Sequence, residues 1–247
     1  RRRFAASVAA DVASAPGGDV ATRRLVESAT RLGDDFLRAL LAAYPSTPAD
    51  SRGTFLSLVD TVASSDEAGD EARDASGRLF LEVLRSASRP IRVQVMESRL
   101  CSDPRLGRAI RRDLCLDFLQ SLHALRAERI FDLTVSTLTR MGPAILGELK
   151  SRIGESSYAE ERRAAATALG EIAWKDREVD GVLRFFRELD VDRLPAGMAL
   201  RETGRLCSHP AADPALVAEV AKDCLKRLSA NEDLFAVVDA LGWLGAG

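Results

Sequence analysis

Four segments in the second half of this chain end in the same way, and their spacing limits the folds it can adopt. Each segment closes with an apolar residue followed by a small one: TLTRMG (137–142), ALGEIA (168–173), ETGRLC (202–207) and ALGWLG (240–245). Their final residues lie 31, 34 and 38 positions apart: Gly142, Ala173, Cys207 and Gly245. Self-similarity at such a period, with two helices in each period, is the sequence signature of a helical repeat protein.

The segments around these ends have the periodicity of amphipathic helices. Val182, Phe185, Phe186 and Leu189 follow i, i+3, i+4, i+7 spacing, which places them on one helix face. No stretch alternates between apolar and polar residues with β-branched enrichment, and aromatic residues make up only 5% of the chain. The sequence therefore predicts an all-α protein, with roughly a dozen helices joined by short loops.

The segments AAATALGEIA (164–173) and VVDALGWLGAG (237–247) are the best matches in the chain to the pattern A-x-x-A-L-G-x-[LI]-[GA], from which the second departs at Val237. In this the chain resembles the HEAT-repeat family, specifically its bacterial-style units, from about residue 89 onward. The resemblance implies a right-handed α-solenoid of antiparallel helix pairs that acts as a binding scaffold, with the second helix of each pair lining a concave surface. We expect HEAT-like repeats over residues 89–247, continuing beyond the C-terminus, and atypical helical repeats over residues 1–88.

The first 88 residues are less regular. Apolar residues from Leu25 to Leu40 predict one long helix with Gly33 inside it, ending near Tyr44 and Pro45. Thr47 is a plausible N-cap for the next helix, with Pro48 at its first position. The stretch SSDEAGDEARDASG, residues 64–77, is acidic and poor in large apolar groups, so we expect it to include an exposed loop.

Two related hexapeptides, RLCSDP (99–104) and RLCSHP (205–210), raise the question of a cysteine site used twice. We expect the first helix to end near Cys101 and the next to begin at Pro104, whereas Asp213 and Pro214 begin the helix after Cys207. Buried core packing is the favoured role for all four cysteines, because structural zinc needs four ligands. No metal or cofactor is predicted, and reduced thiols favour a cytoplasmic protein.

No catalytic motif of the common hydrolase, kinase, metalloprotease or dinucleotide-binding types occurs in the sequence. The two histidines, His123 and His209, do not form a catalytic pattern. The stretch WKDREVD (174–180) is faintly similar in composition to the Trp and Asp residues of HEAT-like DNA glycosylases. We favour a plainer interpretation, in which Trp174 covers the end of a helix, and we predict that the chain is not an enzyme.

Charge changes sign sharply along the chain although the total is only -2. Residues 60–82 carry a net -5, and residues 85–112 carry a net +6. One interpretation is that the two segments form solvent-exposed helix faces whose opposite charges partly neutralise one another. The other interpretation is a ridge of arginines that binds an acidic or phosphate-bearing partner. This ridge lies on an Arg-rich helix, residues 104–119, and consists of Arg105, Arg108, Arg111 and Arg112.

These observations predict a non-catalytic protein-binding or assembly scaffold, whose partner is another protein or another part of a larger parent chain. Two alternatives stay open. One is a HEAT protein that binds nucleic acid through the Arg-rich helix 104–119, although a net charge of -2 does not favour a polyanion. The other is a HEAT-fold enzyme such as a DNA glycosylase-like protein. No apolar run is long enough to predict a membrane span.

Overall fold

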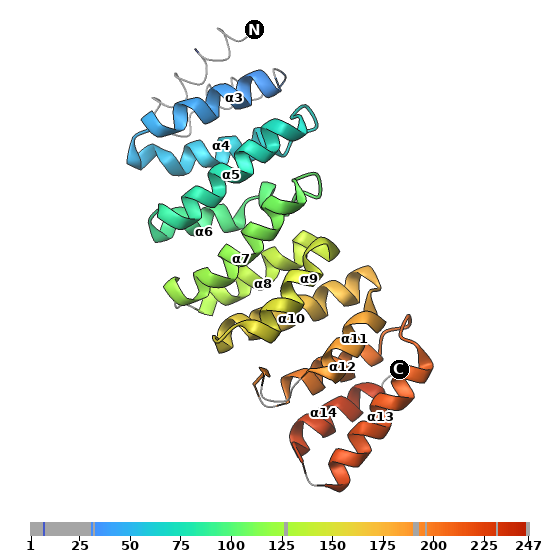
Figure 1. Ribbon diagram of the computed structural model, residues 1–247. Coiled ribbons are helices and arrows are strands. Elements are labelled where there is room, and N and C mark those ends of the chain that lie inside the picture. Colours follow the sequence, from blue (N-terminus) through green and yellow to red (C-terminus); the bar gives the residue numbers. More distant parts are fainter. Residues whose placement is uncertain are drawn as a thin grey trace. The chain divides into compact units, whose positions relative to one another are not determined.

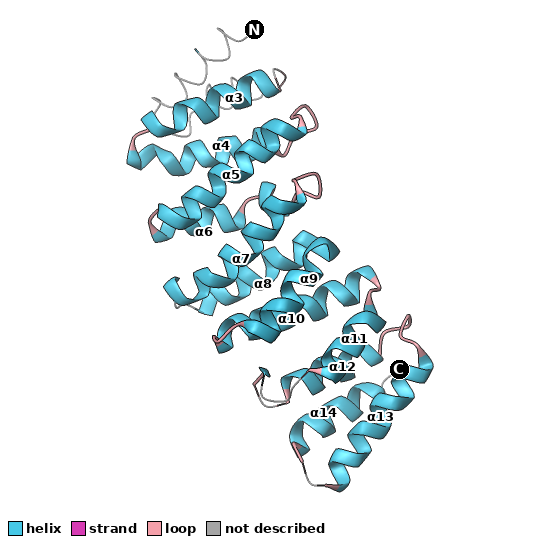
Figure 2. Cartoon of the chain, in the orientation of Figure 1, coloured by secondary structure: helices cyan, strands magenta, loops and turns pink. Residues whose placement is uncertain are grey.

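The computed structural model describes residues 7, 31, 33–125, 128–189, 193–195, 197–230 and 232–245, without the side chains of 123–125 and 128. These residues are helical, joined by short loops and turns, and contain no strand (Figure 2). The predicted all-α class is therefore confirmed. The chain divides into two compact units, Arg1–Phe118 and Leu119–Gly247, each with its own packing.

The first unit is built from α3 (Asp34–Ala43), α4 (Arg52–Ala63), α5 (Asp70–Ser86), α6 (Arg89–Glu97) and the first part of α7 (Arg108–Leu125). Short 3-10 helices cover Tyr44–Ser46, Ala49–Ser51 and Leu100–Ser102. Helix α3 packs on α4 and α5, and α4 also packs on α5 and α6 (Figure 1). The core between these helices consists of fully buried apolar side chains, among them Phe36, Phe55, Phe80, Met96 and Leu100.

Two sequence expectations for this unit need correction, and a third, an exposed loop within residues 64–77, is confirmed. Gly33 lies before α3 rather than inside a helix, because its φ of 53° is left-handed. The earlier part of the predicted helix, Leu25–Thr30 and Leu32, lies outside the described residues. Thr47 does not cap a helix: its hydroxyl donates to the carbonyl oxygen of Ala43, and Pro48 precedes a 3-10 turn. Of the acidic stretch 64–77, the first part is a loop, but α5 already begins at Asp70.

The second unit contains α8 (Glu128–Met141), α9 (Leu146–Glu155), α10 (Ala159–Asp176), α11 (Val179–Glu188), α12 (Met198–Cys207), α13 (Pro214–Ser229) and α14 (Leu234–Leu244). Helices α8, α10, α12 and α14 contact one another in series. The other three pack beside them as the pairs α9–α10, α11–α12 and α13–α14 (Figure 1). The same contacts thus recur from one helix pair to the next.

A glycine and a proline form the junction between α8 and α9. Helix α8 ends at Met141, and Gly142 follows with a left-handed φ of 69°. Pro143 lies in a 3-10 turn over Gly142–Ile145, after which α9 starts at Leu146. A left-handed glycine after a helix and a proline at the start of the next element are the expected residues there.

Glycines in the third position of two of the repeated hexapeptides lie in close contact with the next helix of the series. A Cβ added at Gly170 would overlap the ends of the Glu202 and Arg205 side chains on α12. A Cβ added at Gly204 would lie 2.5 Å from the Cα of Ala240 on α14. The first unit has a similar contact at Gly77, within ASGRLF (75–80), against the side chains of Leu106 and Ile110. Of these three glycines, Gly204 is the one that faces the backbone of its neighbour.

Replacing Gly204 with alanine is expected to lower stability by about 1–3 kcal/mol, because Ala240 Cα is backbone and cannot move aside without separating α12 from α14. Gly242 occupies the matching position in α14, and a Cβ there meets nothing within 4 Å. Gly242→Ala should therefore raise stability by up to about 1 kcal/mol through helix propensity. Chemical denaturation of dilute protein measures both. Equal effects of the two substitutions would contradict the close contact.

Aspartates tie neighbouring helix pairs together at intervals close to the sequence period. Asp34 on α3 accepts a hydrogen bond from the backbone N–H of Gly69, 35 residues later, at 2.6 Å. Asp74 accepts from Gly107, and Asp180 accepts from Asp213, each 33 residues later. In all three cases the bonded N–H lies just before α5, α7 or α13, where backbone donors have no partner within the helix.

Candidate functional site

The Arg-rich segment does not form a helix from residue 104. The Asp103 carboxylate accepts a hydrogen bond from the backbone N–H of Arg105 at 2.8 Å, and the N–H of Leu106 donates to the carbonyl oxygen of Asp103. This turn occupies the chain up to Gly107, so α7 begins only at Arg108. The helix predicted from residue 104 therefore begins only at Arg108, because the Asp103 side chain competes with the helix for backbone N–H donors.

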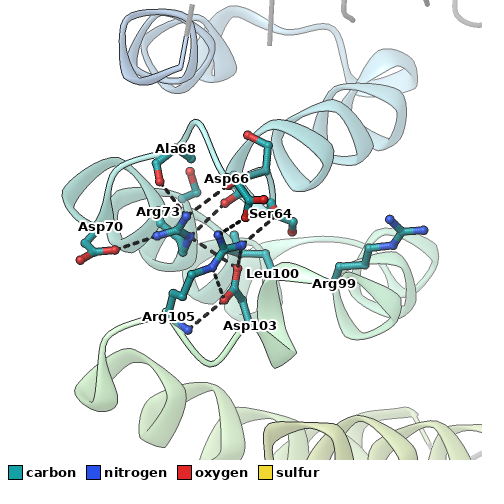
Figure 3. Close-up of polar contacts among 12 residues, drawn as sticks. Ser64, Asp66, Ala68, Asp70, Arg73, Arg99, Leu100, Asp103 and Arg105 are labelled. Carbon is teal, nitrogen blue, oxygen red and sulfur yellow. Dashed lines mark hydrogen bonds and ion pairs between the residues drawn. The ribbon is translucent and has the colours of Figure 1, made fainter. Parts of the chain in front are cut away.

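Arg105 is separated from the other three predicted arginines by this turn and points into a polar network (Figure 3). Its guanidinium donates to Asp103 at 2.9 Å, to Asp66 at 2.8 Å and to the carbonyl oxygen of Ser64 at 2.9 Å. The hydrogen bond to Asp103 is the main reason that the pKa of Arg105 is raised. Arg105 therefore connects the loop before α5 to the turn before α7.

Arg108, Arg111 and Arg112 lie together on the first turns of α7, as their spacing predicts. Arg108 and Arg112 are exposed, and Arg111 is half-buried. Within the part of the chain that the structure describes, none of the three forms an ion pair, and the buried Nε of Arg111 has no hydrogen-bond partner. Arg108 and Arg112 are therefore exposed to a partner and Arg111 is partly exposed beside them, whereas Arg105 is held within the chain.

The centre of the polar network is Arg73, which sequence reasoning did not single out. Its side chain is 2% exposed, and it donates to the carbonyl oxygens of Ala63 at 3.1 Å, Ser65 at 3.2 Å and Ala68 at 2.6 Å. It also pairs with Asp70 at 2.8 Å and with Asp103 at 3.4 Å (Figure 3). The available sequence signal was an isolated arginine within a run of acidic residues.

Asp103 joins the two arginines, and its side chain is only 5% exposed. Burial acts to raise its pKa, but the hydrogen bonds from Arg105, with the charges of Arg105 and Arg73, hold the pKa below its usual value. Arg99 lies near this group in sequence, but its side chain points away from it (Figure 3). Because the buried donors and acceptors satisfy one another, the network fixes two loops and offers no open position for a substrate.

The stretch 174–180 joins α10 to α11, and Trp174 is half-buried beside the following turn. Its ring meets the His209 ring edge-on, with the centroids 4.8 Å apart, and the Arg205 guanidinium lies 5.8 Å from its centroid. Asp180 accepts from the backbone N–H of Asp213, as described above. Trp174 and Asp180 of this stretch thus contact the turn after α12, whereas Asp176 is exposed. The side chain of His123 lies outside the described residues.

The four cysteines are buried thiols. Cys207 ends α12, and Asp213 caps α13 by accepting from the N–H of Ala215, which agrees with the prediction for the second hexapeptide. In the first hexapeptide Cys101 lies instead in the 3-10 turn after α6, so the two cysteines are not structurally equivalent. Burial raises the pKa of Cys207 to about 11, which disfavours the reactive thiolate.

Among the described residues, no cluster of three or more histidine, cysteine or acidic side chains is arranged to hold a metal ion. Within the same part of the chain, no helix has both the length and the apolar character needed to cross a membrane. Comparison of the sequence with protein-family models and with curated proteins gave no match, and a search of solved structures also gave none.

Proposed function

We propose that the chain is a right-handed α-solenoid of HEAT-like repeats that serves as a non-catalytic scaffold for a protein partner. The observation that carries this proposal is the recurrence of the same contacts between successive helix pairs. Gly170 contacts α12 and Gly204 contacts α14 at the same position of their hexapeptides. Three aspartates each accept a hydrogen bond from a backbone N–H 33 to 35 residues later in the chain: Asp34, Asp74 and Asp180. Repetition of one interface along a chain is how solenoids are built.

The partner surface of this scaffold is the cationic group Arg108, Arg111 and Arg112. Repeat proteins commonly bind other proteins through a row of exposed side chains on successive helices. The guanidinium groups of Arg108 and Arg112 are exposed and have no ion-pair partner among the residues that the structure describes, which favours a carboxylate-bearing surface that they can hold through paired hydrogen bonds. The favoured partner is therefore a protein with an acidic surface.

Small-angle X-ray scattering tests the architecture. A compact chain of 247 residues has a radius of gyration of about 18 Å. A solenoid of this length should give a clearly larger value once the data are extrapolated to zero protein concentration. A measured value near that of a compact chain would overturn the solenoid.

A titration with polyglutamate and with single-stranded and duplex DNA tests the partner. We expect polyglutamate binding that weakens at least about tenfold in the Arg108→Glu/Arg112→Glu variant. An Arg38→Glu variant is the control, because Arg38 is an exposed arginine that already pairs with Glu71. Nucleic acid is favoured instead if DNA binds more tightly than polyglutamate, falls steeply as salt rises and is lost in the double variant.

A further inference from the structure

A groove of about 480 Å³ lies between α3 and α5 in the first unit. Its walls come from the end of α3 with the 3-10 turn after it, from the start of α4 and from α5 from Ala75 onward. Typical ligand sites have volumes of roughly 300–1,000 Å³, so the groove is large enough to hold a ligand. Because it lies between two successive helix pairs, further chain that lengthens the stack at either end would not fill it.

Much of the lining of this groove is apolar. Six residues form the apolar lining: Leu41, Pro45, Ala75, Leu79, Val83 and Ala87. Val83 is buried, but Leu41 and Leu79 keep part of their surface exposed. An apolar group that covers this surface removes it from water, which favours binding.

Charged side chains of both signs border the apolar lining. Arg52 lies at the start of α4, and Arg78 and Glu82 lie one turn apart on α5; all three are exposed. The Nε of Arg52 donates to the carbonyl oxygen of Thr47 at 3.3 Å. Among the residues that the structure describes, none of the three charged side chains forms an ion pair. Two cations against one anion leave the groove with a net positive charge.

Half-buried Tyr44 lies close to two of these charges. The Arg52 guanidinium is 5.7 Å from the centroid of the Tyr44 ring. Burial is the main reason that the pKa of Tyr44 is raised, while Arg52 acts to lower it and Glu82 to raise it. Its hydroxyl is therefore protonated at neutral pH, and no hydrogen bond to another described residue occupies it. The groove thus combines an apolar lining with phenol and guanidinium donors, which can hold an anionic group.

We propose that this groove binds a short acidic segment of the partner protein, with an apolar side chain of the segment in the groove and a neighbouring carboxylate on Arg52 and Arg78. Guanidinium groups without ion-pair partners are suited to carboxylates. The proposal rests on the acidic protein partner inferred above, but it adds a second contact, since Arg108, Arg111 and Arg112 do not line the groove.

Two features favour a peptide over a small free acid. Small ligands are usually buried over roughly 70–90% of their surface, whereas the exposed rim of this groove leaves a ligand open to water. Glu82 would repel a ligand that carries only negative charge, but a peptide backbone supplies N–H donors for its carboxylate. A segment with an acidic and an apolar side chain therefore suits the apolar lining, the two arginines and Glu82 together.

Fluorescence polarisation with short labelled peptides tests the groove. The probe has one phenylalanine between two pairs of glutamates. In one comparison peptide alanine replaces the phenylalanine, and in another glutamines replace the glutamates. The probe should bind at least about fivefold more tightly than either comparison peptide, because it alone uses both the apolar lining and the arginines.

Substitutions in the groove locate the binding. Arg78→Gln should weaken probe binding at least about threefold, whereas Arg99→Gln, which removes an exposed arginine outside the groove, should not. Arg78 is exposed, so the unfolding of Arg78→Gln in denaturant should match wild type. Ala75→Phe fills the groove and should remove the preference for phenylalanine over alanine.

Equal binding of the phenylalanine and alanine peptides would overturn the groove, even if polyglutamate binds through Arg108 and Arg112. The Arg108→Glu/Arg112→Glu variant should keep the phenylalanine preference; a preference lost there but kept in Arg78→Gln also overturns the groove. Polyglutamate binding that is insensitive to Arg108→Glu/Arg112→Glu would instead contradict the partner surface on α7 alone. If 3-phenylpropionate, a free acid without an N–H, displaces the probe at lower concentration than the unlabelled peptide does, a small acid is the ligand and the peptide is ruled out.

Discussion

Leu169→Asp is expected to unfold the unit formed by residues 119–247. Leu169 is fully buried on α10, the helix that contacts α8, α9, α11 and α12. The substitution removes a core leucine and places a carboxylate where no described cation is positioned to pair with it. We expect a loss of at least about 4 kcal/mol of unfolding free energy, against a total of roughly 5–15 kcal/mol for a typical domain.

Circular dichroism and hydrogen exchange measure this loss. Amide protection should fall throughout α8–α14 rather than in α10 alone, because each helix pair covers the apolar side of its neighbour. Leu225→Asp makes the same chemical change at a side chain that is 57% exposed, and in dilute protein it should leave the melting curve nearly unchanged. A melting curve for Leu169→Asp that matches wild type would rule out this packing.

Features that depend on local spacing could be predicted from the sequence. Val182 and Phe186 of α11, whose spacing predicts a shared helix face, are both buried, because residues four apart must lie on one side of a helix. Asp213 caps α13 as expected, because an Asp before a Pro at the first helical position is a strong local signal. The grouping of Arg108, Arg111 and Arg112 on one helix followed from the same spacing rule.

Features that depend on contacts across the unit could not be predicted. The left-handed conformation of Gly33 brings it against the carbonyl oxygen of Glu67, more than thirty residues later, and no local pattern encodes that approach. Arg105 was assigned to a surface ridge because charge alone places arginine outside, but Asp66 and Ser64 hold it within the chain. Arg73 was overlooked because an arginine is rarely fully buried unless its partners surround it.

Arg73→Met should destabilise the first unit by about 3–5 kcal/mol, as breaking a buried charge pair does. Methionine keeps an unbranched apolar stem in place of the aliphatic part of the arginine, but it lacks the guanidinium and donates no hydrogen bonds. The carbonyl oxygens of Ala63 and Ala68 lose their donor, and buried Asp103 loses one of its two cations. Chemical denaturation followed by hydrogen exchange in α4 and α5 measures the loss.

Arg38→Met is the matched control in the same unit. Arg38 pairs with Glu71 at 2.9 Å, but its side chain is 49% exposed and that of Glu71 is 85% exposed. An exposed pair of this kind contributes at most about 1 kcal/mol, so the control should change stability little. Similar losses for Arg73→Met and Arg38→Met would show that the buried network does not hold the two loops.

The pH dependence of stability separates the role of Asp103 from simple packing. Its folded-state pKa is lowered, so its ionised form stabilises the folded chain above its unfolded-state pKa of about 3.9. That stabilisation is lost as the pH falls through the lower, folded-state value. Asp103→Asn should therefore lower stability at neutral pH and flatten the loss of stability in acid. Because Arg73 contributes to the lowered pKa, Arg73→Met should flatten the same acid transition in part, whereas a purely packing role would leave its slope unchanged.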